Sequence, residues 1–259
     1  MAPVIRGLWG AVFLGLALAA SGVRVAPLPA VQGRPFWVEV ERPVAFVTYL
    51  GRRAPVFRGK ALVPVPARAP VGSWRLWLAD GRHLEVPLVL GRYGFRRLQL
   101  VGKSNLLAPT VLKKARARIR RACAWRAAAL PERWRWPLLA PVSAPFGERR
   151  DYGRFVSYHA GVDLAAPAGT PVYAVARGRV GFAGDLGPRG QAVIVDHGRG
   201  LCSIYAHLSA IEVKAGEIVD PETELGRVGS TGFSSGPHLH LEFRLLDVPQ
   251  DPAFFLGAP

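Results

Sequence analysis

Five residues in the C-terminal half of the chain carry metal-binding or proton-transfer groups at spacings that favour β-strands. His159 and Asp163 are four residues apart, His238 and His240 are two apart, and His207 lies between the two pairs. In a strand the side chains at i, i+2 and i+4 lie on one face, so each pair would share a face if both segments are strands. Two histidines and one carboxylate would form a site with three protein ligands and an open fourth position, the ligand count of a catalytic zinc site.

The local sequence around both pairs favours strands over helices. Residues 160–171 contain two glycines and two prolines, too many for a helix. Gly161, between the first pair, is expected to leave room for a metal ion. After Pro237, apolar and polar residues alternate, with Leu239, Leu241 and Phe243 on one side and His238, His240 and Glu242 on the other. This period of two predicts a strand whose polar face carries the site.

Each of these residues also has a purely structural interpretation. His207 alone could be a surface or core residue, and His159 with Asp163 could be a hydrogen-bonded pair. All five together, in this order, favour a metal site over those alternatives. The other two histidines, His83 beside an Asp-Gly turn and His197 within Asp-His-Gly-Arg-Gly, are predicted to be turn or surface residues.

Several longer motifs surround these residues. They are Phe146-Gly-Glu-Arg149, His159-Ala-Gly-Val-Asp163, Ala168-Gly-Thr-Pro-Val-Tyr-Ala174, Val193-Ile-Val-Asp-His-Gly198, Tyr205-Ala-His-Leu208, and Gly229-Ser-Thr-Gly232 with Gly236-Pro-His-Leu-His-Leu-Glu242. With these motifs, residues 141–259 resemble the LytM/lysostaphin-type zinc metallopeptidases, peptidase family M23. The resemblance implies a compact antiparallel β peptidase domain with the metal at one end of a groove. The loop of residues 229–236 is expected to form one wall of that groove.

The resemblance also implies roles for the five residues. It implies that His159, Asp163 and His240 bind one Zn²⁺ per chain, and that His207 and His238 are the catalytic histidines beside it. Such an ion would lower the pKa of a bound water towards about 7 for attack on the amide, and the two histidines would assist with proton transfer. For Glu242 two roles stay open, orienting a ligand imidazole or pairing with an arginine.

The N-terminal half divides into an export segment, a β domain and a linker. Residues 1–24 begin with a basic stretch, continue with an uncharged apolar run from Leu8 to Ala20, and contain Ala17-Leu18-Ala19. They are predicted to be a signal peptide or an uncleaved N-terminal anchor, which places the other domains outside the cytoplasm. Residues 25–98 contain alternating apolar runs and an Asp80-Gly81 hairpin signal, and predict a small Ig-like β-sandwich.

Residues 99–140 are predicted to form a basic helical linker. Thr110 is expected to cap a helix that runs to Leu130, before Pro131. From Arg92 to Arg154 the chain has sixteen Lys and Arg residues against three acidic ones, and its formal net charge is +16. The basic helix is either a solvated face or a surface attracted to anionic cell-wall polymers or to a membrane surface. Nucleic acid is not an expected partner, because the chain is predicted to be exported.

The peptidase domain, residues 141–259, is expected to contain hairpins formed by residues 170–183 and 191–207. The two cysteines, Cys123 and Cys202, lack a metal-binding spacing, and a buried free thiol is favoured over a disulfide. Alternation places Cys202 on the strand face opposite His207.

These observations, together with the resemblance, predict a mainly β, monomeric, exported zinc endopeptidase. The resemblance implies that its substrate is the peptide cross-links of bacterial peptidoglycan. One alternative is a non-catalytic cell-wall-binding activator of an amidase. Another is a mononuclear iron oxygenase, which also uses two histidines and a carboxylate. The segments before the peptidase domain are hypothesised to cover its groove, with Asn105 and Glu132 as candidate donors and Glu148 as a less favoured one; the alternative is a plain spacer.

Overall fold

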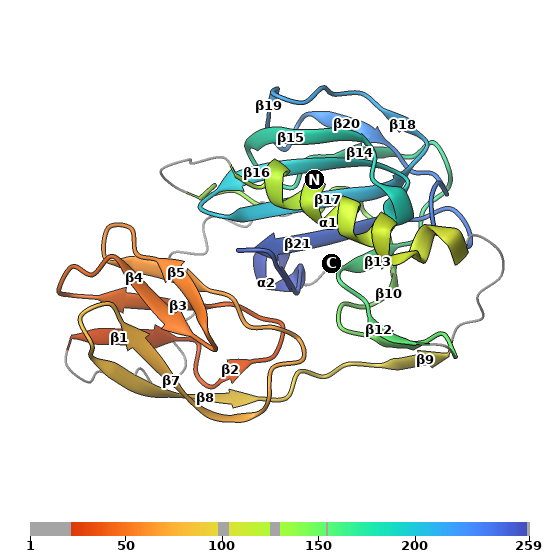
Figure 1. The fold of residues 1–259 in the computed structure, drawn as a ribbon. Helices are drawn as coiled ribbons and strands as arrows, with labels where there is room; N and C mark the ends of the chain where they lie inside the picture. The colour runs from red at the N-terminus through yellow and green to blue at the C-terminus, as the bar shows by residue number, and fades with distance from the viewer. Residues whose placement is uncertain (1–21, 98–103, 125–129, 154, 258–259) are drawn as a thin grey trace. The chain divides into compact units, whose positions relative to one another are not determined.

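The computed structural model describes residues 22–97, 104–124, 130–153 and 155–257 (Figure 1). The predicted signal peptide or anchor lies almost entirely outside these residues. Two compact units are present: one runs from Tyr93 to Asp247 and continues from Asp251, and the other ends at Arg92 and includes Val248–Gln250. Within the described ranges, no helix combines the length and apolar character needed to span a bilayer.

The N-terminal unit consists of two β-sheets. Their strands are β1 (Val23–Ala26), β2 (Ala30–Val31), β3 (Phe36–Val40), β4 (Phe46–Tyr49), β5 (Arg52–Pro55), β6 (Lys60–Val63), β7 (Gly72–Leu78) and β8 (His83–Val89). Strand β22 (Val248–Gln250) belongs to neither sheet. One sheet has the order β1-β3-β6 and the other β2-β8-β7-β4-β5. The rings of Phe36 and Tyr49, one from each sheet, pack edge to face with centroids 5.1 Å apart, so the core lies between the sheets.

The predicted hairpin at Asp80-Gly81 is confirmed. Strands β7 and β8 pair in antiparallel register from Gly72 with Leu88 to Trp77 with His83. Gly81 adopts a φ of 89°, a conformation that glycine reaches without steric cost. The turn therefore follows from its sequence.

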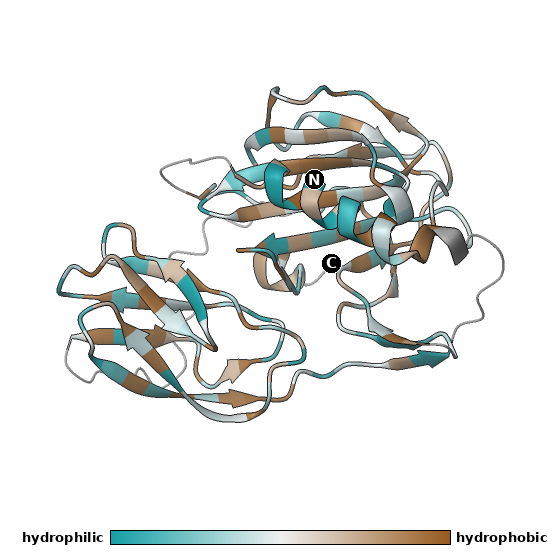
Figure 2. Ribbon diagram, in the orientation of Figure 1, coloured by the Kyte–Doolittle hydropathy of each residue, from teal (hydrophilic) through white to brown (hydrophobic). Residues whose placement is uncertain are grey.

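The C-terminal unit, which contains the predicted peptidase domain and is named the peptidase unit after it, is built on one long antiparallel sheet with the order β10-β13-β21-β17-β16-β15-β19. These strands are β10 (Val142–Ala144), β13 (Val162–Leu164), β15 (Gly178–Asp185), β16 (Gln191–Gly198), β17 (Leu201–Leu208), β19 (Ile218–Val219) and β21 (Leu239–Leu245). Strand β17 is buried along its whole length, and β16 in all but its first residue, which places both in the core (Figure 2).

Smaller elements surround this sheet. Strand β9 (Phe95–Arg97) pairs with β11 (Arg149–Asp151), which pairs with β12 (Val156–Tyr158). Strand β20 (Glu224–Arg227) lies between β14 (Pro171–Tyr173) and β18 (Ala210–Ile211). Three short helical segments are η1 (Ser104–Leu107), η2 (Gly187–Arg189) and α2 (Ala253–Leu256).

One of the two hairpins predicted in this unit is present. Strands β16 and β17 form the expected hairpin over residues 191–208. The predicted hairpin over residues 170–183 is wrong, because β14 pairs with β20. Strand β15 already has β16 on one edge and β19 on the other, so no edge remains for β14.

Helix α1 (Pro109–Ala122) packs on the sheet through its apolar face. Ala115, Ile119 and Ala122 are buried against a cluster that includes Ile194 and Ile204. The other face carries six exposed basic residues, Lys113, Lys114, Arg116, Arg118, Arg120 and Arg121. The sequence pattern therefore predicts the helix, and its amphipathic character explains why it docks rather than remaining solvated on all sides.

Two details of the predicted helix are wrong. Thr110 does not cap it, because Pro109 occupies the first turn and Ala108 is the N-cap residue, without a side-chain hydrogen bond. The helix ends at Ala122 rather than at Leu130. Residues 125–129 lie outside the described part of the chain.

Cys123, just after α1, forms a disulfide with Cys202 of β17, with Cα atoms 5.7 Å apart. The predicted free thiol is therefore wrong. The two residues are 79 positions apart, so local periodicity could not reveal that the helix brings one onto the other. The disulfide ties the end of α1 to the centre of the sheet.

Candidate metal centre and groove

Three of the five residues singled out in the sequence form a buried cluster. Asp163 of β13 and His240 of β21 lie directly opposite each other in the sheet register. Asp163 Oδ1 is 2.8 Å from His240 Nδ1 and 3.0 Å from His159 Nε2, and the two imidazole nitrogens are 3.0 Å apart. Two imidazole nitrogens and one carboxylate oxygen converging in this way are a donor set that fits zinc.

His159 reaches the cluster differently from the prediction. It lies between β12 and β13, so it does not share a strand face with Asp163. The space at Gly161 is also used differently: an added Cβ would lie 2.1 Å from the carbonyl oxygen of Leu241. Glycine is therefore needed there because the backbone of β21 passes close by. The prediction that Gly161 leaves room for a metal ion is wrong.

Backbone and side-chain contacts select which nitrogen of each cluster imidazole faces the site. His159 Nδ1 lies 2.8 Å from the carbonyl oxygen of Pro145, so it donates there and leaves Nε2 facing Asp163. His240 is turned the other way, with Nδ1 toward Asp163 and Nε2 3.6 Å from Glu242. The ligand atoms of a bound metal would be His159 Nε2, Asp163 Oδ1 and His240 Nδ1.

The protonation states of Asp163 and His159 suit metal binding. Burial opposes ionisation of Asp163, but its contacts with His159 and His240 outweigh this effect and lower the pKa of the carboxyl group. For His240, burial lowers the pKa, but the contacts with Asp163 and Glu242 outweigh it, so the net pKa is raised. Burial lowers the pKa of His159, so its imidazole is neutral near pH 7. An ionised carboxylate and a neutral imidazole are the protonation states that ligate a metal ion.

His207 joins the cluster through an unusual backbone conformation. It is the penultimate residue of β17, with a φ of 65°. Register pairs Ala206 with His240 and Cys202 with Arg244, so regular alternation would turn His207 away from the face that carries His240. The left-handed conformation brings its ring centroid within 5.9 Å of that of His240. The prediction that Cys202 lies opposite the site face is therefore wrong.

His238 and His207 form a pair beside the three cluster residues. Their ring centroids are 4.8 Å apart, and His238 Nε2 lies 3.7 Å from Asp163 Oδ1. Each is held through Nδ1, His207 by the carbonyl oxygen of Thr231 at 2.8 Å and His238 by that of Gly236 at 2.9 Å. Burial lowers the pKa of His207 to about 3, so its imidazole is neutral at neutral pH.

All five residues line one groove of about 620 Å³. Phe233, Ser234 and Ser235 also line it, which confirms that the loop of residues 229–236 forms part of its wall. Tyr152 contributes an aromatic side, with its ring centroid 6.2 Å from that of Phe233. The candidate ligands are thus accessible from an elongated cavity.

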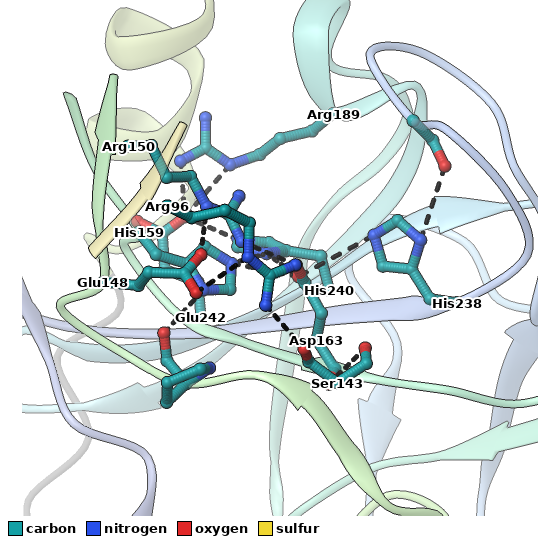
Figure 3. A network of polar contacts seen from close by, with 12 residues as sticks. Arg96, Ser143, Glu148, Arg150, His159, Asp163, Arg189, His238, His240 and Glu242 are labelled. Atoms are coloured by element: carbon teal, nitrogen blue, oxygen red, sulfur yellow. Dashed lines mark hydrogen bonds and ion pairs between the residues drawn. The ribbon is translucent and has the colours of Figure 1, made fainter. Parts of the chain in front are cut away.

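Glu242 fills one of the two roles left open by the sequence. It is fully buried, and it accepts hydrogen bonds from Arg189 and Arg244. Its carboxylate also faces His240 Nε2 (Figure 3). Burial raises its pKa, but Arg189 and Arg244 outweigh that effect, so the net pKa is lowered and the group is ionised. The pairing with arginine is therefore present, and the carboxylate also lies beside a candidate ligand, so the orienting role stays a prediction.

Sequence reasoning missed two arginines of the site. Arg189 is the last residue of η2 and donates to Glu242, and Arg150 of β11 donates from Nη2 to Asp163 Oδ2 at 3.0 Å. Only the position of Arg150 directly after the Phe146–Arg149 motif could have pointed to it.

The structure shows the side chains of two of the three residues that were hypothesised to cover the groove, Glu132 and Glu148. Glu148 is buried and forms ion pairs with Arg150 and Arg96, and the exposed Glu132 is not among the groove-lining residues. The side chain of Asn105 lies outside the described part. Latency stays a prediction.

The two remaining histidines differ from each other. His83 is exposed, as predicted, and its ring stacks at 4.5 Å on Trp77. His197 is buried, so the prediction of a turn or surface residue is wrong. Strand β16 extends through His197 into the core, and the turn begins two residues later.

Comparison with known proteins assigns this fold and site to a class of metallopeptidases. Residues 157–252 match the model of Peptidase family M23. A solved structure described as a putative peptidase M23 from Pseudomonas aeruginosa is 30% identical and superposes with a TM-score of 0.66, covering 90% of this chain and 96% of that one. The chain belongs to peptidase family M23. The predicted mainly β fold with a peptidase domain of this type is confirmed.

Curated relatives match over the peptidase unit. DD-carboxypeptidase/endopeptidase Mpg of Neisseria meningitidis is 45% identical over 112 residues, 43% of this chain and 26% of the relative. Peptidoglycan DD-endopeptidase ShyA of Vibrio cholerae is 39% identical over 103 residues, 39% of this chain and 24% of the relative. The matched stretch spans about a quarter of each relative's length.

Proposed function

We propose that this protein is an exported zinc endopeptidase that hydrolyses peptide cross-links of bacterial peptidoglycan. The observation that carries the proposal is the convergence of His159, Asp163 and His240 in a groove that also receives His207 and His238. The name of the relative ShyA, a peptidoglycan DD-endopeptidase, supports the substrate class, and the name of Mpg supports an endopeptidase activity. A peptidoglycan substrate lies outside the cytoplasm, in agreement with the predicted export segment.

His159, Asp163 and His240 would hold the zinc ion, which would act as a Lewis acid that acidifies water and polarises a peptide carbonyl. The proton transfers fall to His207 and His238, whose Nδ1 atoms are occupied by backbone carbonyls and whose Nε2 atoms are available to the groove. A neutral imidazole takes a proton from the attacking water, and an imidazolium returns one to the leaving amine as the C–N bond breaks.

The groove walls suit an extended peptide. Strand ends and the loop with Ser234 and Ser235 line the cavity, and backbone groups of such loops can pair with a peptide main chain. The aromatic side formed by Tyr152 and Phe233 offers packing for apolar substrate groups.

The partner proposed for helix α1 is an anionic cell-wall polymer. Its apolar face is buried in the peptidase unit, so it has no face to insert into a bilayer in the manner of an interfacial helix. Its solvent face is cationic. Arg118 donates to a neutral group, the carbonyl oxygen of Asp185, and keeps its positive charge at the surface, whereas Arg120 forms an ion pair with Asp247 at 4.0 Å. Charge complementarity with a polyanion supports this partner.

Zymography on purified peptidoglycan tests the proposed function against its rivals. We expect clearing with the zinc-loaded protein, loss of clearing with a chelator, and recovery when zinc is added back. A non-catalytic activator would give no clearing without an added amidase. Metal analysis of protein purified without added metal separates zinc from the iron of an oxygenase.

A further inference from the structure

The two carboxylate oxygens of Asp163 have different partners. Oδ1 faces the imidazole nitrogens of His159 and His240, at 3.0 and 2.8 Å. Oδ2 accepts a hydrogen bond from Arg150 Nη2, at 3.0 Å. Only one oxygen of Asp163 therefore points into the candidate metal site.

Arg150 is itself held in place by a buried acid. Its Nε donates to Glu148 Oε1 at 3.0 Å, and the other oxygen of Glu148 receives Arg96 Nε at 3.1 Å. The side chain of Glu148 is 5% exposed and that of Arg150 is 18% exposed, so water competes little for these bonds. Figure 3 shows this continuous series from Arg96 through Glu148 and Arg150 to Asp163.

The same short segment also holds the second candidate ligand. The backbone amide of His159 donates to the carbonyl oxygen of Glu148, and that of Gly147 donates to the carbonyl oxygen of His159. With the contact from Pro145 to His159 Nδ1, residues 145–150 position His159 through the backbone and Asp163 through Arg150.

We propose that Arg150 is a positioning residue that makes Asp163 a one-oxygen ligand and thereby sets the affinity of the site for zinc. A guanidinium group can bond two carboxylates at once in a fixed geometry, which an ammonium group cannot. Glu148 pairs with both Arg150 and Arg96, so it offsets only part of the charge of Arg150. Loss of that positive charge would favour a bound cation, so a fall in zinc affinity would report lost positioning rather than changed repulsion. The inference rests on the proposed zinc site but not on hydrolysis.

The test compares zinc affinities of metal-free full-length variants by competition with a chromogenic chelator. Loss of a group that orients a metal ligand costs on the order of 10–100-fold in affinity. We expect Arg150→Gln to fall in that range and Arg150→Lys to lose on the order of threefold. Arg149→Gln is the matched control, because it removes the same charge from an exposed neighbour whose guanidinium lies over the Phe95 ring; it should stay within about twofold of the parent.

A spectroscopic measurement separates positioning from a general loss of structure. Cobalt(II) bound at the site should show an altered visible spectrum in Arg150→Gln and an unaltered one in Arg149→Gln. Equal zinc affinity and equal cobalt spectra in these two variants would overturn the proposal. If Arg150→Gln does not fold, Arg150→Lys decides: parental affinity overturns the proposal, and a loss supports it. Since none of these readouts involves hydrolysis, failure of the peptidase assignment leaves them interpretable.

Discussion

The buried histidines of the peptidase unit are of two kinds, which differ in whether the second ring nitrogen also has a hydrogen-bond partner within the surrounding core. His197 has both nitrogens satisfied, Nδ1 by the carbonyl oxygen of Arg177 at 2.9 Å and Nε2 by Ser203 Oγ at 2.8 Å. Ser203 is hydrogen-bonded to Tyr205, whose hydroxyl accepts from the amide of Val175, and the Trp134 ring covers His197 at 5.0 Å.

In the groove, by contrast, His159, His207 and His238 each use one nitrogen on a backbone carbonyl. Their other nitrogens face the groove or the cluster. The difference teaches that burial and hydrogen bonding alone do not distinguish a structural histidine from a functional one. The distinction lies in whether a held imidazole keeps a nitrogen free for a ligand or a proton.

The largest expected effects are those of substitutions in the groove. His159→Ala, Asp163→Ala and His240→Ala should each abolish zinc binding and peptidase activity together. His207→Ala and His238→Ala should retain most of the zinc and lose activity by about 10²–10⁴-fold, the usual contribution of proton transfer. Metal content and turnover measured on the same preparations check this, and an empty site in His238→Ala with zinc retained in His240→Ala would reverse the ligand assignment.

The opposite pattern is expected at His197, which is buried and hydrogen-bonded through both ring nitrogens. His197→Ala should lower the free energy of unfolding by roughly 3 kcal/mol, because it opens a cavity and leaves buried partners without hydrogen bonds. Its zinc affinity should equal that of the parent. The matched control is His83→Ala, an exposed histidine of the other unit, which should change stability by less than about 0.5 kcal/mol. Reduced zinc affinity in His197→Ala at unchanged stability would break the comparison.

The positions that could be predicted from the sequence are set by near neighbours in the chain. Those that could not be predicted are set by contacts with distant residues. The alternation after Pro237 predicts which side chains of β21 share a face, because that pattern depends only on residues two positions apart. His207 was expected to follow regular alternation, but it has a positive φ, and its Nδ1 contacts the carbonyl oxygen of Thr231 in a loop 24 residues away. Arg150 contacts an aspartate on another strand, and Cys123 meets Cys202 through the docking of a helix. Such contacts depend on tertiary packing and leave no periodic signal.

Burial of His197 also predicts that the free energy of unfolding depends on pH. Burial lowers the pKa of His197 from 6.5 to about 4, so between these values the unfolded chain binds a proton that the folded protein does not. Stability from this group is therefore full above pH 6.5 and falls as the pH drops towards 4, by roughly 2 kcal/mol between pH 7 and pH 4.5. Urea unfolding with chelator present should show this loss in the parent protein in excess of that in His197→Ala. Parallel losses in the two proteins would contradict it.

The smallest effect is expected on the solvent face of helix α1. Replacing Lys113, Lys114, Arg116 and Arg121 with Gln should weaken binding to anionic cell-wall polymer at low salt, and the difference should shrink as salt rises, because exposed charges are screened over about 10 Å at 0.1 M. Turnover of a short neutral peptide should barely change. Cosedimentation with purified cell wall measures the first effect, and equal losses on both substrates would assign the basic face a structural role.

The central claim is most directly tested by mass spectrometry of fragments released from defined cross-linked muropeptides by the zinc-loaded protein. The account predicts fragments that have gained one water at a peptide bond of the cross-link, with none formed by His207→Ala protein carrying the same amount of zinc. Intact muropeptides, cleavage only within the glycan, or equal cleavage by His207→Ala would contradict it.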